Sequence, residues 1–204
     1  MTTGTPRGIF ERNVPGMTER LARATVSIAG CGGLGSNVAV ALTRAGVGHL
    51  ILADRDAVEA SNLNRQAFNA ADIGRRKVTA LAAHLREIRA DLALTLHDTE
   101  VTRDNVATLF GGGEILVEAF DDAAAKILLI EAWTRAFPDR TIVCGNGLAG
   151  VGRTAALTVV RTGHIVFCGD MESDMALGLA APRVAMVAAM QANEVCELLM
   201  GDRT

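Results

Sequence analysis

The chain has 204 residues, of which 50% are hydrophobic and 3% aromatic, and its 20 basic and 23 acidic residues leave a formal net charge of −3. This length predicts one domain with a sizeable core. The lack of a basic excess argues against a dedicated nucleic-acid binder or membrane-surface binder. No stretch approaches the ~18 apolar residues of a membrane span, and no signal peptide is recognisable. We expect a cytoplasmic protein with a single domain over residues 1–204, in which residues 1–24 form a helical lead-in.

The cysteines are dispersed and form no C-x-x-C pair; they are Cys31, Cys144, Cys168 and Cys196. Structural zinc sites of the ribbon type need such pairs, and secreted disulfide frameworks need closely spaced cysteines. The sequence therefore predicts free thiols and no zinc.

Short apolar runs alternate with longer segments of helical periodicity through residues 25–144. The pattern predicts strands over 25–29, 49–53, 92–96, 114–119 and 141–144, and helices over 36–45, 75–90, 103–110 and 122–137. Apolar strands that alternate with helices are typical of a parallel sheet with helices on both faces. We expect an α/β, Rossmann-like fold.

The alternation changes after residue 146. Residues 155–160 and 164–167 predict an antiparallel hairpin, residues 169–181 a loop, and Pro182 the start of a last helix that runs to about Met200. That helix is apolar on nearly all sides, so its own sheet or a second subunit must bury it. We expect a homodimer in which this helix takes part.

A glycine-rich loop joins the first strand to the first long helix. Gly30, Gly32 and Gly35 form G-x-G-x-x-G, Gly33 doubles the second glycine, and Asp54 lies at the end of the next strand. Such glycines let backbone N–H groups approach phosphate, and the carboxylate accepts hydrogen bonds from ribose. The loop predicts a nucleotide site, with a turn that merely packs helix on strand as the structural alternative.

The loop alone leaves the ligand open. One candidate is NAD(P), which would make the protein an oxidoreductase of Rossmann type. That chemistry needs an acid–base residue beside the substrate, and the four histidines are scattered along the sequence. The residues after Asp54 distinguish an NAD(P) site from a site for another nucleotide.

Residues 54–66, Asp-Arg-Asp-Ala-Val-Glu-Ala-Ser-Asn-Leu-Asn-Arg-Gln, resemble the signature D-x-D-x-V-x-x-S-N-L-x-R-Q of the ThiF/MoeB family, adenylating enzymes related to ubiquitin activators. The doubled-glycine loop precedes the run, and residues 72–77 and 120–123 match later family elements. The resemblance extends from about residue 9 to the end of the chain. The length and the stretches 168–170 and 181–184 look most like the compact ThiF-like branch.

The resemblance implies that ATP and Mg²⁺ serve to adenylylate the carboxyl-terminal glycine of a small ubiquitin-like sulfur carrier. The carrier would be ThiS-like, a further protein would donate the sulfur, and the pathway would lead to the thiazole of thiamine. A catalytically silent carrier-binding homologue is the other alternative. The residues that the resemblance assigns to nucleotide binding are Gly30, Gly32, Gly33, Gly35, Asp54, Asp56, Ser61, Asn62, Arg65, Lys77, Asp121 and Asp122.

The chemistry of these side chains agrees with an adenylating enzyme. The reaction joins an anionic carboxylate to the anionic α-phosphate of ATP, so the site must supply cations. Arg65 can bind phosphate with two parallel hydrogen bonds, and Lys77 adds a point charge. Asp121 at a strand end suits Mg²⁺, which takes one or two protein carboxylates together with phosphate oxygens. An NAD site calls for none of these three residues.

Only two of the 20 basic residues are lysines, Lys77 and Lys126. Lys126 stands one helical turn after Asp122, so pairing with Asp122 and contact with a ligand are both open. The resemblance also implies a basic residue that reaches the phosphates from a neighbouring subunit. Arg12, within Phe-Glu-Arg-Asn, is the candidate for that role.

Two departures from the family pattern concern the site. The family Asp-Asn is Asp121-Asp122 here, and the second carboxylate either repels phosphate or points away along its helix. Some relatives attach the carrier to a cysteine in a crossover loop. Cys168 precedes that loop and is either a nucleophile or an inert buried thiol.

Overall fold

The computed structural model describes residues 8–201, which form one seven-stranded sheet in the order β3-β2-β1-β4-β5-β7-β6. Every neighbouring pair is parallel except β6 against β7. The expected mainly parallel sheet with an antiparallel extension is therefore confirmed. The strands are β1 Thr25–Ala29, β2 His49–Asp54, β3 Ala93–Asp98, β4 Ile115–Glu118, β5 Ile142–Gly145, β6 Thr158–Thr162 and β7 Ile165–Gly169.

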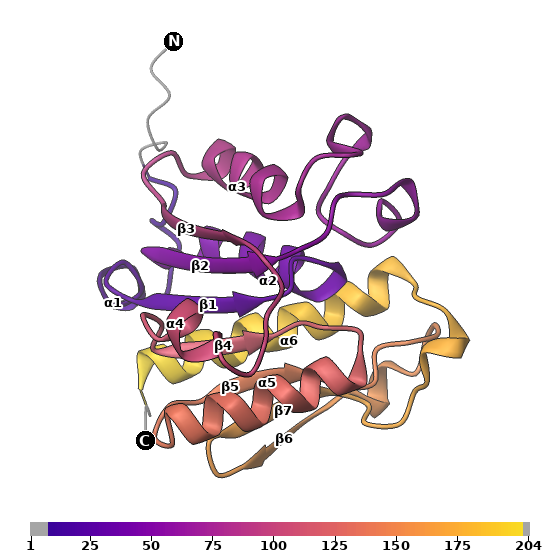
Figure 1. Cartoon of the computed structure of the whole chain (residues 1–204). Helices are drawn as coiled ribbons and strands as arrows, with labels where there is room; N and C mark the ends of the chain where they lie inside the picture. Colours follow the sequence, from indigo (N-terminus) through magenta and orange to yellow (C-terminus); the bar gives the residue numbers. More distant parts are fainter. Residues whose placement is uncertain (1–7, 202–204) are drawn as a thin grey trace.

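Helices cover both faces of this sheet (Figure 1). Helices α2, α3 and α6 pack into the larger of two apolar cores, and α4 and α5 pack into the other. None of the helices within residues 8–201 has the length and apolar character of a bilayer-spanning segment. The helices are α1 Met17–Leu21, α2 Gly33–Ala45, α3 Lys77–Ile88, α4 Val106–Phe110, α5 Ala123–Ala136 and α6 Ala181–Met200.

The expected elements are all present, with shifts at their ends. The amide of Thr102 donates to Asn105 Oδ1, which forms a turn, and so α4 begins only at Val106. A 3₁₀ turn over Thr154–Ala156 takes the first residues of the expected hairpin strand. Of the lead-in expected over residues 1–24, the structure shows α1, while residues 1–7 lie outside the described part of the chain.

Helix α6 buries one side against α2 and the sheet. Val184, Val187 and Val195 lie on that buried side. Ala185 and Ala189 on the opposite side are exposed. The sheet and α2 of the same chain therefore bury only one side of α6, although its sequence is apolar on nearly all sides.

The start of α2 crosses β1 so closely that a side chain does not fit. A Cβ built on Gly35 would lie 1.8 Å from the carbonyl oxygen of Gly30. Gly30 itself has φ of 94°, in the left-handed region that favours glycine. These two glycines bring the amino terminus of α2 to the carboxyl end of β1.

Candidate nucleotide-binding cleft

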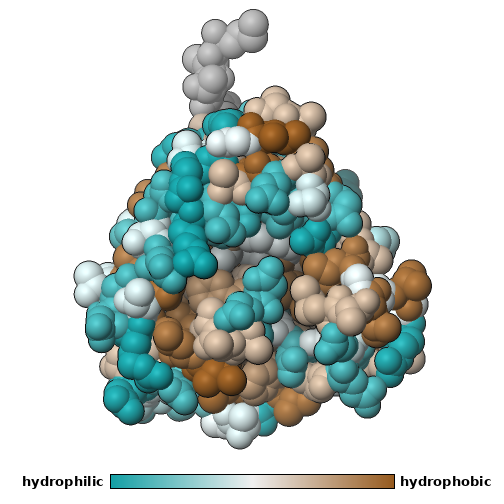
Figure 2. All heavy atoms as spheres, turned by 45° about the vertical axis from the view of Figure 1, so that its right-hand side comes forward, coloured by the Kyte–Doolittle hydropathy of each residue, from teal (hydrophilic) through white to brown (hydrophobic). Residues whose placement is uncertain are grey.

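A cleft of about 430 Å³ lies at the carboxyl ends of the central strands. The sheet order reverses between β1 and β4, and ligands of open α/β sheets bind at such a switch point. Figure 2 shows this side of the molecule hollowed near its centre. The predicted site residues that line the cleft are Gly30, Gly32, Gly33, Asp54, Asp56, Arg65, Lys77, Asp121 and Asp122.

Asp54 holds the glycine loop against the end of β2. Its Oδ2 accepts the amide of Cys31 at 2.7 Å, and its Oδ1 accepts the amide of Asp56 at 2.8 Å. Burial raises the pKa of Asp54, although these two amides and Lys77 oppose the rise. The carboxylate therefore shapes the loop as well as facing the cleft.

Lys77 begins α3 and points into the cleft. Its side chain is 9% exposed and its Nζ lies 2.9 Å from Asp56 Oδ2. The backbone of Lys77 also donates to the carbonyl of Asp56 at 2.9 Å, so both ends of the residue are held. Asp56 is more than half exposed. An anionic ligand would therefore encounter an almost fully buried ammonium whose ion pair within the described residues is with Asp56 and whose charge also acts on the Asp54 carboxylate.

Arg65 adds a second cation to the lining of the cleft. Its Nη1 donates to the carbonyl of Ser61 at 3.0 Å and to Asn64 Oδ1 at 2.8 Å. These partners are neutral, so the positive charge of the guanidinium is not cancelled by an ion pair within residues 8–201.

Asp121 and Asp122 follow β4 and differ in their surroundings. Asp122 accepts the amide of Ala125 at 2.7 Å and thereby caps α5. Asp121 is exposed at the cleft and has no hydrogen bond or ion pair within the described residues. The Asp122 carboxylate thus stabilises the start of α5, and the Asp121 carboxylate is available to bind a ligand.

Glu118 and Lys126 form a pair that the sequence did not indicate. Glu118 ends β4 with no exposed surface, and Lys126 Nζ contacts Glu118 Oε2 and donates to the carbonyl of Gly145 at 2.9 Å. Burial raises the pKa of Glu118, and Lys126 opposes the rise. The expected alternative in which Lys126 pairs with Asp122 is wrong, because the buried carboxylate has the greater need of a cation. A glutamate at the end of an apolar strand is the signal that would have indicated it.

A buried ion pair fixes the loops at the far wall of the cleft. Arg183 Nη2 lies 2.5 Å from Asp170 Oδ2, and both side chains are at most 2% exposed. Asp170 Oδ1 also accepts the amides of Glu172 at 3.0 Å and Ser173 at 2.8 Å. Burial alone would raise the pKa of Asp170, but the hydrogen bonds from Ser173, Glu172 and Arg183 lower it to about 2. The pair holds the loop that brings Ser173 to the cleft.

Three further predicted residues do not line the cleft. Gly35 serves the close crossing of α2 and β1. Asn62 Oδ1 accepts the amide of Glu59 at 3.0 Å, which closes a 3₁₀ turn over Ala60–Asn62, and Ser61 Oγ donates to Glu59. The nucleotide contacts expected of Ser61 and Asn62 stay predictions.

Arg12 lies at the other end of the molecule from the glycine loop of its own chain. The neighbouring Phe10 packs on the guanidinium of Arg89 and near Gly46, which follows α2. The 13 residues of α2 separate Gly46 from the glycine loop by roughly 20 Å. A role for Arg12 at the phosphates therefore requires a second copy of the chain.

The thiol of Cys168 is fully buried, and burial raises its pKa to about 12. It stays protonated at neutral pH, which favours the inert alternative over the nucleophile. Within residues 8–201, no three His, Cys, Asp or Glu side chains gather into a metal site.

The reversed strand order and the glycine loop at the start of α2 define a Rossmann-like fold, and the cleft at its switch point is lined by two cations. The ThiF family model matches residues 9–204. The chain therefore belongs to the ThiF family.

Curated relatives share about a third of the residues over most of this chain. The adenylyltransferase and sulfurtransferase MOCS3 of Culex quinquefasciatus is 30% identical in an alignment 200 residues long, which covers 90% of this chain and 43% of the relative. The sulfur carrier protein ThiS adenylyltransferase of Bacillus subtilis is 32% identical in an alignment 197 residues long, which covers 92% of this chain and 58% of the relative. The chain thus spans about half the length of these relatives.

Solved structures confirm the fold. The E. coli tRNA N6-threonylcarbamoyladenosine dehydratase TcdA, in complex with AMP, superposes with a TM-score of 0.84 at 23% identity and covers 95% of this chain and 93% of the other. The Rossmann-like architecture expected from the sequence is therefore shared with a protein whose structure holds a nucleotide.

Proposed function

We propose that this protein is an adenylyltransferase that uses ATP to activate the carboxyl-terminal glycine of a small ubiquitin-like sulfur carrier. The observation that carries the proposal is the joint position of Arg65, Lys77 and Asp121 around the glycine loop. A nicotinamide site requires no such combination of two cations and a free carboxylate. Family membership and the names of the relatives support the proposal.

In the proposed reaction, a carboxylate oxygen of the carrier attacks the α-phosphorus of ATP, and the bond to pyrophosphate breaks. Negative charge accumulates on the phosphate oxygens as this happens. Lys77 and Arg65 oppose that charge, and the amino terminus of α2 adds its backbone N–H groups. Because Lys77 is almost fully buried, its charge is weakly screened there.

Mg²⁺ fits the proposed site. Asp121 offers a free carboxylate at the cleft, and Mg²⁺ is commonly held by one or two carboxylates together with substrate phosphates and water. When bound, the ion would neutralise phosphate charge.

The carrier in this proposal is ThiS-like, a separate protein donates the sulfur, and the product serves thiazole formation in the cytoplasm. The Bacillus subtilis relative, named for its action on the sulfur carrier ThiS, supports this choice. The carboxyl terminus of the carrier would enter the cleft, since its terminal carboxylate must reach the α-phosphate.

A homodimer completes the proposal. The exposed side of α6 carries Ala185 and Ala189, with Met186 and Met190 half-buried beside them. Such an apolar row suits a second copy of the chain. Arg12, which does not reach the cleft of its own chain, would act across this dimer.

Carrier-dependent exchange of labelled pyrophosphate into ATP tests the proposed reaction. We expect exchange with purified protein, Mg²⁺ and the diglycine-ended carrier encoded beside its gene, and none when the terminal glycine of the carrier is removed. Absence of exchange with every such carrier would contradict the proposal. Carrier binding without exchange would identify a silent homologue, and binding of NAD(H) in place of ATP would identify an oxidoreductase.

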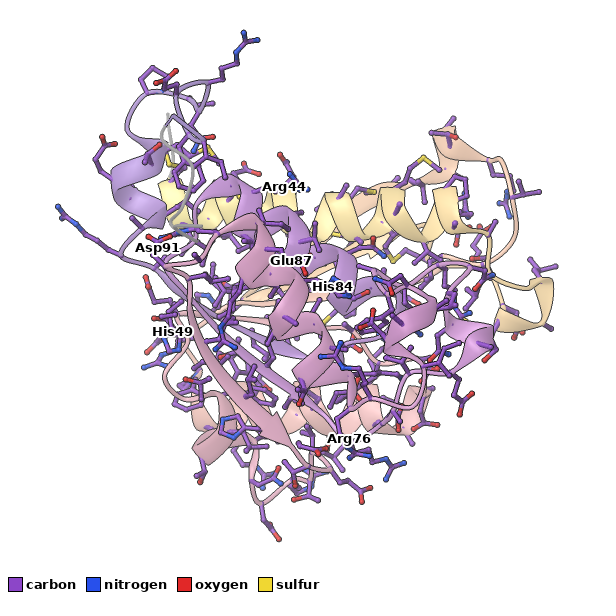
Figure 3. All side chains as sticks on the ribbon, turned by 90° about the horizontal axis from the view of Figure 1, so that it is seen from above. Arg44, His49, Arg76, His84, Glu87 and Asp91 are labelled. Atoms are coloured by element: carbon purple, nitrogen blue, oxygen red, sulfur yellow. The ribbon has the colours of Figure 1, made fainter. Side chains whose placement is uncertain are left out.

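Replacing Lys77 by methionine is expected to weaken exchange about 10- to 100-fold, because a charged hydrogen bond to phosphate is lost. Arg76→Met is the matched control. Arg76 immediately precedes Lys77 in the chain and lies at the start of α3 (Figure 3). Its side chain binds Asp98 on the surface. We expect this control to exchange pyrophosphate at the wild-type rate, and equal losses in both variants would exclude a specific role for Lys77.

A further inference from the structure

Gln66 follows Arg65. Hydrogen bonds of the adjacent residues Arg65 and Ala67 hold it against the first turn of α2. Asn37 Nδ2 donates to the carbonyl of Arg65 at 2.9 Å, and the amide of Ala67 donates to Ser36 Oγ at 3.0 Å. The backbone of Gln66 itself donates to the carbonyl of Asn62 at 3.0 Å. The backbone at this position is therefore well anchored.

The side chain of Gln66 has no such partner. Gln66 is 9% exposed, and within residues 8–201 its Oε1 is buried without a hydrogen bond. The amide lines the cleft, and a Cβ built on Gly32 would lie 3.7 Å from its Nε2. An anchored residue thus presents an unpaired amide beside the glycine loop.

Buried polar groups without a partner are rare in native proteins, and each one calls for an explanation. Replacing such an amide with an apolar group would relieve the desolvation penalty. A retained, unpaired amide at a cleft is therefore best explained by a partner that arrives with the ligand.

We propose that Gln66 is a nucleotide-binding residue, whose side-chain amide forms hydrogen bonds with the ATP held at the start of α2; this inference rests on the proposed function. The amide supplies two donors and one acceptor. A nucleotide matches both, since its phosphate oxygens accept and its ribose hydroxyls donate. Arg65 and Lys77 in the same cleft supply positive charge, and the directional hydrogen bonds of Gln66 orient the nucleotide.

Gln191 on α6 provides an internal comparison. It too is buried with an unpaired Oε1, but its Nε2 donates to the carbonyls of Glu118 at 2.9 Å and Val143 at 3.2 Å. Gln191 therefore joins the end of β4 to the neighbouring strand β5. Replacement by methionine should therefore lower the affinity for ATP at position 66 and the melting temperature at position 191.

The experiment measures two quantities for wild type, Gln66→Met and Gln191→Met. These are the affinity for ATP in Mg²⁺ buffer by calorimetric titration, without any carrier, and the melting temperature without nucleotide. Methionine has nearly the shape of glutamine and lacks its hydrogen bonds. We expect Gln66→Met to bind ATP about tenfold more weakly or worse, with a melting temperature equal to or above wild type. Gln191→Met should show a lower melting temperature and nearly wild-type affinity.

A third variant tests the donor. Gln66→Glu keeps the acceptor but places a negative charge beside phosphate, and it should weaken ATP binding more than Gln66→Met does. Wild-type affinity in Gln66→Met would overturn the inference while leaving the proposed function intact. A fall in melting temperature like that of Gln191→Met would overturn it in favour of a structural role. Failure of the wild-type protein to bind ATP would overturn both proposals.

Discussion

Asp121→Ala is expected to lower carrier-dependent ATP–pyrophosphate exchange about 100- to 1,000-fold while leaving the melting temperature unchanged. The carboxylate is exposed at the cleft and has no hydrogen bond or ion pair within residues 8–201, so its removal breaks nothing in the fold. Loss of a metal-binding carboxylate removes several kcal/mol of charge stabilisation from the transition state. Initial rates at saturating carrier, measured beside a thermal melt, give both quantities.

Glu131→Ala is the matched control, because Glu131 is an exposed carboxylate further along the helix that follows Asp121 and it pairs with Arg103 on the surface. This variant should exchange pyrophosphate normally. Asp122→Asn adds a second comparison, since asparagine also caps helices well and the change removes one negative charge from the cleft. Retained exchange in Asp121→Ala would exclude Asp121 from the proposed metal site.

Arg183→Met is expected to destabilise the protein by about 3–5 kcal/mol, because it leaves the Asp170 carboxylate buried and without its cation. For a chain of this size the melting temperature would fall by about 6–20 °C. Exchange should fall as well, since the loop that Asp170 organises brings Ser173 to the cleft. Chemical denaturation at pH 7 measures the loss.

The double variant Arg183→Met with Asp170→Asn separates the charge from the packing. Asparagine keeps an acceptor for the amides of Glu172 and Ser173 but carries no charge. We therefore expect the double variant to be more stable than Arg183→Met alone. Arg103→Met, which breaks a surface pair with Glu131, should have little measurable effect. Equal stability of the double variant and Arg183→Met would show that the buried charge is not the cause.

The same pair predicts a dependence on pH. Hydrogen bonds and Arg183 lower the pKa of Asp170 to about 2, below the value of an unfolded aspartate. The contribution of Asp170 to stability is therefore fully present above about pH 4 and is lost as the pH falls toward 2. The stability difference between wild type and Arg183→Met should shrink over that interval, and a constant difference would contradict the assignment.

Much of the fold could be predicted from the sequence, because local patterns determine it. Apolar strands such as Thr25–Ala29 end at a glycine, and helices such as Lys77–Ile88 repeat their apolar residues at helical spacing. The clustering of Gly30, Asp54 and Asp121 follows from the same logic, since each lies at or shortly after the end of a strand and parallel strands end at one edge. Linear motifs were sufficient for these residues.

The interactions between segments far apart in the chain could not be predicted in this way. Lys126 was expected to meet either Asp122 one turn away or a ligand, yet it binds Glu118 on the adjacent strand and Gly145 on the next. Asp170 and Arg183 lie on either side of a loop whose path no local pattern describes. Partner choice among charges depends on burial, and burial exists only once the sheet and helices have packed.

The sequence by itself therefore determined the order of strands and helices along the chain, the glycine loop and the residue types of the proposed nucleotide site. Only the tertiary structure decided which of those residues face the cleft, that Asp122 caps a helix while Asp121 stays free, and that Gln66 presents an unpaired amide. The physical reason is that propensity and periodicity act over a few residues. Desolvation and hydrogen-bond satisfaction instead depend on every group that packing brings near.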